Sequence, residues 1–94
     1  EPETYSNEYI YATQRRDIDV NKHMHNLNYL DLAYETLPEN IYNQEELNNI
    51  EIMYKTAIRL GDISKCKYSF NNGKHCVVIK SNDEKVLHCI INLW

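Results

Sequence analysis

The stretch that decides the fold of this chain is NLNYLDLAYETL, residues Asn26–Leu37, which Pro38 follows. Three polar positions, Asn28, Asp31 and Glu35, are spaced i, i+3 and i+7, so on a helix they form one narrow stripe. Apolar side chains cover nearly all of the remaining surface, and proline ends the helix because it cannot donate a backbone hydrogen bond. A helix that is apolar on most sides must be buried on most sides. In so small a domain, only a sheet that curls around the helix can bury it.

The segments outside this helix supply the strands of such a sheet. Residues Tyr9–Arg16 alternate loosely and predict a strand, and the polar residues Asp17–His25 predict a loop that leads into the helix. Glu39–Asn49 is a polar connector, with a short helical turn expected at Gln44–Asn48. Ile50–Leu60 then alternates with period two, which predicts a long amphipathic strand whose inner face packs against the helix.

Three further strands follow, each bounded by a turn signal. Gly61 and Asp62 predict a turn, and Asn71–Gly73 is a strong hairpin signal. The strands are expected at Ile63–Phe70, His75–Lys80 and Val86–Trp94. The order is then one strand, one helix and four antiparallel strands. This order predicts an α+β fold: a single hot-dog domain in which a five-stranded antiparallel sheet wraps a central helix.

Length, charge and cysteine content narrow the classes of function. The chain has 94 residues, which predicts one domain, and its net charge of −4 argues against the basic footprint of a nucleic-acid binder. Cys66, Cys76 and Cys89 are odd in number, form no C-x-x-C pair and lie in apolar runs. They predict reduced core cysteines and a cytoplasmic setting. No signal peptide and no membrane-length apolar stretch occurs in the sequence, so a membrane is not an expected partner. For the charge reason given above, nucleic acid is not an expected partner either.

The residues immediately before the helix carry the candidate chemistry. The segment Asp17–Asn26, DIDVNKHMHN, holds two carboxylates, two histidines and two carboxamides. A helix N-terminus presents unpaired N–H groups and a partial positive charge, which is what an oxyanion hole for a carbonyl under attack requires. A histidine at this position can act as a base toward water, and an asparagine or aspartate can orient it.

Two other interpretations fit the same residue types. In the first, Asn21 or Asn26 caps the helix and the histidines are surface loop residues. In the second, Asp19, His23 and His25 bind a metal ion, although two histidines two positions apart in a loop are weak ligand spacing. The residue types alone leave all three interpretations open.

The run Asp17–Pro38, DIDVNKHMHNLNYLDLAYETLP, resembles the helix-entry motif of the acyl-ACP thioesterases of fatty-acid synthesis. In that family the motif is D-x-D-x-N-x-H-x-N-N-x-x-Y, followed by a helix that ends in E-x-x-P. The matching positions are Asp17, Asp19, Asn21, His23, Asn26, Tyr29, Glu35 and Pro38. Ile50–Asp62 is similar to the family's long strand and its Gly-Asp turn. Asp19 and His23 also match the D-x-x-x-H spacing of hot-dog acyl-CoA thioesterases.

The resemblance implies an activity and a set of residues that perform it. It implies hydrolysis of the thioester of fatty acyl-ACP, with release of free fatty acid and without a metal or an organic cofactor. Catalysis would fall on Asp19, Asn21 and His23. In these roles His23 activates or holds the attacking water, Asn21 orients the substrate carbonyl or that water, and Asp19 holds the loop by accepting hydrogen bonds. The implied partner is an acyl carrier protein loaded with a fatty acyl chain.

The resemblance also implies a domain organisation. Members of that family hold two hot-dog domains in one chain, and this motif belongs to the second. Residues 9–94 are therefore expected to form the C-terminal hot-dog domain, and residues 1–8 to be the remainder of a linker. Because an unpaired edge strand invites association, a homodimer or pairing with a second hot-dog domain is expected.

Two positions depart from the family's pattern. Its strand after the helix carries Y-x-x-E, whereas here Tyr54 is followed at that spacing by Ala57. His25 replaces the first residue of the Asn-Asn pair, and Glu35 is a candidate to supply the missing carboxylate. Ala57 keeps open the alternative of a non-catalytic hot-dog module for acyl binding or dimerisation. A hot-dog dehydratase or hydratase fits less well, because its motif lies in a Gly-rich setting and this chain has 2 glycines.

Overall fold

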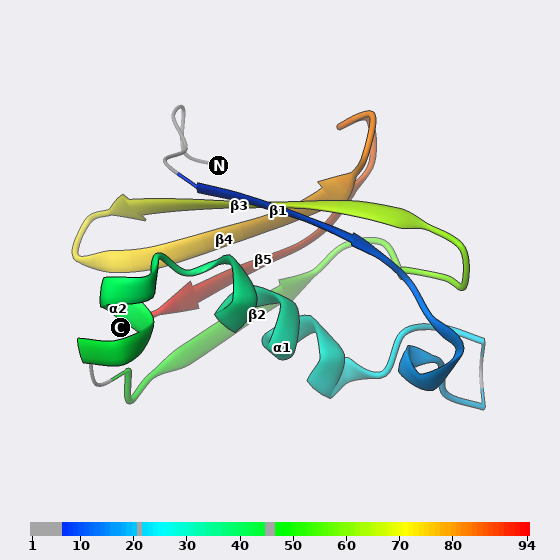
Figure 1. Ribbon diagram of the computed structural model, residues 1–94, viewed down its shortest axis with the longest axis horizontal. Helices are drawn as coiled ribbons and strands as arrows, with labels where there is room; N and C mark the ends of the chain where they lie inside the picture. The colour runs from blue at the N-terminus through cyan, green and yellow to red at the C-terminus, as the bar shows by residue number, and fades with distance from the viewer. Residues whose placement is uncertain (1–6, 21, 45–46) are drawn as a thin grey trace.

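The computed structural model describes residues 7–20, 22–44 and 47–94. Figure 1 shows a sheet with one principal helix, α1, lying across one of its faces. In chain order the elements are β1 (Asn7–Ala12), the 3₁₀ turn η1 (Arg15–Asp17), α1 (Asn26–Thr36), α2 (Glu39–Gln44), β2 (Ile50–Tyr54), β3 (Ile63–Asn71), β4 (Lys74–Ser81) and β5 (Leu87–Leu93).

The sheet is antiparallel throughout. Its strand order is β1-β3-β4-β5-β2, so the strands before and after α1 form the two edges. The predicted α+β class and hot-dog arrangement are therefore confirmed: a five-stranded antiparallel sheet packs around one helix. This topology brings the segment that precedes α1 toward the chain that follows β2, where the candidate site lies.

The core fills the space between α1 and the sheet. Tyr29, Leu32 and Ala33 from the helix pack in one cluster with apolar side chains of the three central strands. Those strand residues are Cys66, Tyr68, Val77, Ile79, Cys89, Ile91 and Leu93. The prediction that the helix is buried on most sides is wrong for its outer side, because Leu27 is 66% exposed. The sheet stays open at β1 and β2, and so it covers only one side of the helix.

Three predicted element bounds need correction. β1 ends at Ala12 rather than Arg16, because the chain turns into η1 there. β2 ends at Tyr54 rather than Leu60, because the next two N–H groups both donate to the carbonyl of His88 and so interrupt the ladder. The short helix lies at Glu39–Gln44 rather than Gln44–Asn48, and residues 45–46 of that predicted turn lie outside the described residues. Pro38 accounts for its position, since its carbonyl accepts the N–H groups of Ile41 and Tyr42, both at 3.0 Å, and the helix starts directly after it.

The hairpin turn and the buried cysteines agree with the sequence predictions. Asn72 and Gly73 both have positive φ, 53° and 76°, as the predicted hairpin requires. All three cysteines are buried and free. Burial raises the pKa of both Cys66 and Cys89 to about 12, so these thiols stay protonated and are not nucleophiles. In the described part of the chain, no helix has the length and apolar character needed to span a membrane.

Candidate active site

The loop before α1 is a tight turn closed by its own backbone. Ile18 and Met24 form an isolated antiparallel bridge, and the N–H of Asp19 donates to the carbonyl of His23 at 2.9 Å. The carboxylate of Asp19 in turn accepts the N–H of His23 at 3.4 Å. Lys22 has a φ of +67°, a left-handed conformation that lets the chain reverse within so few residues. Asp19 and His23 therefore face each other across the base of the turn.

The third residue implied as catalytic, Asn21, lies outside the described residues. The described residues on either side of it belong to the turn that Asp19 and His23 close. The structure thus brings together Asp19 and His23 and says nothing of the Asn21 side chain.

Contacts with the segment that follows β2 hold this loop. The buried side chain of Met24 belongs to the core, and its N–H donates to the carbonyl of Ile58 at 2.8 Å. Next to it, His23 forms an antiparallel bridge with Arg59. The position of His23 is therefore tied to the segment that follows β2.

Asp17 fixes the start of the loop rather than its turn. Its carboxylate accepts hydrogen bonds from the Tyr11 hydroxyl at 2.6 Å, the Gln14 N–H at 2.9 Å and the Asn28 amide at 2.7 Å. Its carbonyl also accepts the N–H of His25 at 2.7 Å. This carboxylate raises the pKa of Tyr11, since ionised Tyr11 would lose its hydrogen bond and repel the charge. Asp17 is 5% exposed, and its contacts join β1, η1 and α1.

Asp19 and His23 line one cleft of about 360 Å³. Both residues are half-buried, so their side chains are held by the protein and still reach the cleft. The other lining residues are Met24, Asn26, Tyr29, Tyr54, Lys55, Thr56 and Ala57. The cleft therefore contains the N-terminus of α1 and the Ala57 position. A carboxylate, an imidazole and a helix N-terminus in one cleft can hold a water molecule next to a polarised carbonyl.

The helix N-terminus differs from both predicted caps. His25 is the N-cap, and its Nδ1 accepts the N–H of Leu27 at 3.2 Å. The cap interpretation for Asn26 is wrong, because Asn26 is the first residue of the helix and lies at the cleft. An N–H at this position has no partner within its own helix. The backbone of residues 7–20, 22–44 and 47–94 gives it no acceptor, so it is a candidate donor to a ligand in the cleft.

The metal interpretation finds no support in the geometry. Across residues 7–20, 22–44 and 47–94, no three His, Cys, Asp or Glu side chains group closely enough to hold a metal ion. His25, one of its three proposed ligands, is exposed and already uses Nδ1 as the helix cap.

Tyr29 is a site residue for which the sequence offered only a motif match. Its hydroxyl accepts the N–H of Ile58 at 2.9 Å, and its ring packs edge-on against Tyr54 with 5.3 Å between centroids. Burial raises the pKa of Tyr29, so the phenol stays protonated. The sequence did contain a signal for this role. Tyr29 lies on the same core-facing side of the helix as Leu32 and Ala33, and a buried tyrosine needs a hydrogen-bond partner for its hydroxyl.

A different cleft, also of about 360 Å³, lies between α1 and β1. Asp17 and Glu35 line it, together with Tyr9, Tyr11, Arg16, Asn28, Asp31 and Leu32. The interpretation of Glu35 as a substitute for the missing carboxylate is therefore wrong. Glu35 belongs to the polar stripe of α1, and that stripe faces this second cleft and not the one that holds His23.

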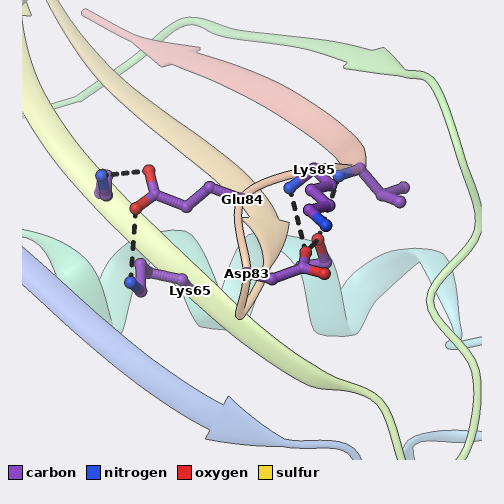
Figure 2. Close-up of polar contacts among 7 residues, drawn as sticks. Lys65, Asp83, Glu84 and Lys85 are labelled. Atoms are coloured by element: carbon purple, nitrogen blue, oxygen red, sulfur yellow. Dashed lines mark hydrogen bonds and ion pairs between the residues drawn. The ribbon is translucent and has the colours of Figure 1, made fainter.

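A third cleft, of about 570 Å³, adjoins the first, because Thr56 and Ala57 line both. Its other wall includes the turn between β4 and β5. Figure 2 shows how that turn is held: Glu84 forms ion pairs with Lys65 and Lys67 of β3. Asp83 accepts hydrogen bonds from the Ser81 hydroxyl at 2.6 Å and the Lys85 N–H at 3.0 Å. The wall that the β4–β5 turn forms is thus fixed by specific contacts.

Comparison with known proteins gives a family match over nearly the entire chain. A family model described as the acyl-ACP thioesterase C-terminal domain matches residues 1–93. Among curated proteins, a chloroplastic dodecanoyl-[acyl-carrier-protein] hydrolase of Cinnamomum camphora is 25% identical over 57 residues. That alignment covers 61% of this chain and 15% of the relative.

Solved structures show the same fold at low sequence identity. The 12:0-ACP thioesterase from Umbellularia californica matches with a TM-score of 0.87 and 16% identity, over 99% of this chain and 36% of that one. An acyl-ACP thioesterase from Bacteroides thetaiotaomicron matches with a TM-score of 0.81 and 17% identity, over 99% of this chain and 40% of that one. This chain therefore spans well under half the length of these three relatives.

Proposed function

Because the chain belongs to the acyl-ACP thioesterase C-terminal domain family, we propose that it hydrolyses the thioester of fatty acyl-ACP and releases the free fatty acid. The observation that carries this proposal is the cleft that Asp19 and His23 share with the N-terminus of α1. Thioester hydrolysis needs a base for water and a donor for the oxyanion, and these are the groups that the cleft offers.

In the proposed reaction His23 is the base. It takes a proton from water as the water oxygen attacks the thioester carbonyl carbon. The negative charge that develops on the carbonyl oxygen is met by the free N–H of Asn26 and the positive end of α1. The tetrahedral intermediate collapses, the C–S bond breaks, and the proton on His23 passes to the leaving sulfur of the carrier's thiol.

In the proposed reaction Asp19 and Asn21 position the reacting groups and transfer no proton. Asp19 holds His23 in place through one backbone hydrogen bond and one contact of its carboxylate at the base of the turn. Asn21, by resemblance to the family motif, orients the substrate carbonyl or the attacking water. Ala57 leaves the cleft without the family's glutamate, so in this proposal His23 alone carries the proton.

The proposal includes a second hot-dog domain on the β2 edge. β2 is an edge strand, and Ile50, Met53 and Tyr54 are each at least 40% exposed there. Tyr54 also lines the cleft of His23, so a second domain paired with β2 would wall the acyl-binding side of the site. For the isolated chain we expect a homodimer through this edge. Light scattering at high protein concentration should give twice the chain mass, and a strictly monomeric mass would contradict the pairing.

The test of the proposed activity uses the two neighbouring histidines. His23→Ala should lower hydrolysis of a long-chain acyl-ACP by about 10²–10⁴-fold, the contribution of a positioned acid–base group. Asn21→Ala should lower it by about 10²-fold, because the carbonyl or the water is then misplaced. His25→Asn is the matched control, since His25 lies outside the cleft and asparagine is a good helix cap. The measurement is release of free carrier thiol, with circular dichroism as a check on folding.

The outcomes separate the activity from its alternative. A wild-type rate in His23→Ala would overturn the catalytic assignment. Binding of the acyl carrier without turnover in the wild-type chain would favour the non-catalytic module, which the replacement of the family's glutamate by Ala57 supports.

A further inference from the structure

The segment that separates the first and third clefts is held by a single buried residue, His88. Two consecutive N–H groups, those of Lys55 and Thr56, donate to the backbone carbonyl of His88 at 2.8 and 3.2 Å. The regular β2–β5 ladder ends one pair earlier, at Tyr54 opposite Cys89. Two residues of one strand against one of its partner is the pattern of a β-bulge, a feature that bends a strand and re-aims its side chains.

The side chain of His88 adds a third contact to the same segment. Its Nδ1 lies 2.8 Å from the carbonyl oxygen of Thr56. A carbonyl oxygen can only accept, so Nδ1 carries the proton and donates. His88 is 4% exposed, and the alternation of β5 turns it to the face of the sheet opposite α1. Neither burial among apolar core residues nor contact with the helix accounts for a histidine there.

A path that alternates hydrogen bonds with short stretches of backbone leads from His88 to the loop of Asp19 and His23. His88 fixes Thr56, and Thr56 and Ala57 form the wall shared by the two clefts. Two residues later, the Ile58 N–H is bound by the Tyr29 hydroxyl, and the Ile58 carbonyl binds the N–H of Met24. Met24 directly follows His23. Contacts of His88 at Thr56 and contacts of Ile58 with Tyr29 and Met24 therefore hold the two ends of the segment that carries Ala57.

We propose that His88 is a positioning residue for hydrolysis in the cleft of His23. It acts through Thr56 and Ala57, by holding the bulge that places this wall opposite His23. The role rests on the proposed function for its catalytic consequence, while the placement of the wall does not depend on any activity.

The test compares two substitutions that differ in one donor. In His88→Asn the side-chain amide carries an N–H near the position of Nδ1, whereas His88→Leu has similar bulk and no donor. The control is His75→Leu, because His75 is also 4% exposed, pairs with Tyr68 at 2.7 Å and lines none of the three clefts described above.

Two readouts are expected. In His88→Leu, kcat for acyl-ACP hydrolysis should fall by about 10–10²-fold with KM within about twofold, as expected for misplaced catalytic groups. His88→Asn should recover most of this loss, and His75→Leu should lower stability without changing kcat per folded molecule. In ¹H–¹⁵N spectra, the amides of Ala57, Ile58 and Met24 should move in His88→Leu and return toward wild-type positions in His88→Asn.

The spectra keep the two proposals separable. If the wild-type chain hydrolyses no thioester, the proposed function fails, and the amide positions alone decide the role of His88. Unmoved Ala57 and Met24 amides in His88→Leu would overturn that role. An equal loss of kcat in His88→Asn and His88→Leu would overturn it too, because the donor would then not matter.

Discussion

Asp17 and Asp19 stand two residues apart in one motif, and they lie in different surroundings. Asp17 is buried and accepts three hydrogen bonds from β1, η1 and α1. Asp19 is half-buried, closes the turn with His23 and lines the cleft. Each carboxylate also borders its own cleft, Asp17 with Glu35 and Asp19 with His23. The comparison indicates that motif membership does not define a role: the groups that surround each carboxylate do.

The largest effect on folding is expected at Asp17. Asp17→Ala leaves the Tyr11 hydroxyl, the Gln14 N–H and the Asn28 amide without their acceptor. An unsatisfied buried donor costs about 1–3 kcal/mol, and these three hydrogen bonds are part-buried, so the free energy of unfolding should fall by about 1–3 kcal/mol in total. Urea unfolding followed by circular dichroism measures this fall. Asp17→Asn, which keeps one acceptor oxygen, should lose less, and an unchanged urea midpoint in Asp17→Ala would remove the distinction between the two aspartates.

The reverse pattern is expected at Asp19. Asp19→Ala removes the carboxylate that accepts the His23 N–H and keeps the backbone hydrogen bond of the turn, so His23 should lose part of its alignment and hydrolysis should fall by about 10–10²-fold. Its urea midpoint should shift much less than that of Asp17→Ala, because the half-buried Asp19 carboxylate accepts the His23 N–H at 3.4 Å, which is longer than the three hydrogen bonds of Asp17. Hydrolysis rates and urea midpoints are both measured for Asp17→Ala and for Asp19→Ala. A variant pair that loses activity and stability in the same proportion would show that the two carboxylates serve one structural purpose.

A smaller effect is expected from adding a carboxylate to the cleft. Ala57→Glu restores the family residue beside His23, and Lys55 in the same cleft should keep the new glutamate ionised. Hydrolysis should rise by about tenfold if a second base limits the rate. Glu35→Gln is the control in the other cleft and should leave the rate unchanged. Steady-state rates on acyl-ACP decide the question, and a response to Glu35→Gln as large as that to Ala57→Glu would mean that the clefts are not independent.

The chain sequence by itself determined the elements whose signals are local. The bounds of α1 are correct to one residue, since a proline and a 3.6-residue pattern define them. The hairpin at Asn72 and Gly73 and the burial of the three cysteines also follow from short stretches. The helix-entry motif led to Asp19 and His23 because their positions in one short loop keep them near each other, whatever the rest of the chain does.

Only the tertiary structure decided which side chains share a cleft. The end of β2 depends on His88, more than thirty residues away, because two N–H groups compete for its carbonyl. The burial of Asp17, the contact of Tyr29 with Ile58 and the assignment of Glu35 to another cleft likewise depend on partners distant in sequence. Alternation and capping preferences describe a residue and its near neighbours. A hydrogen bond between strands is decided by register and burial, which exist only once the sheet has formed.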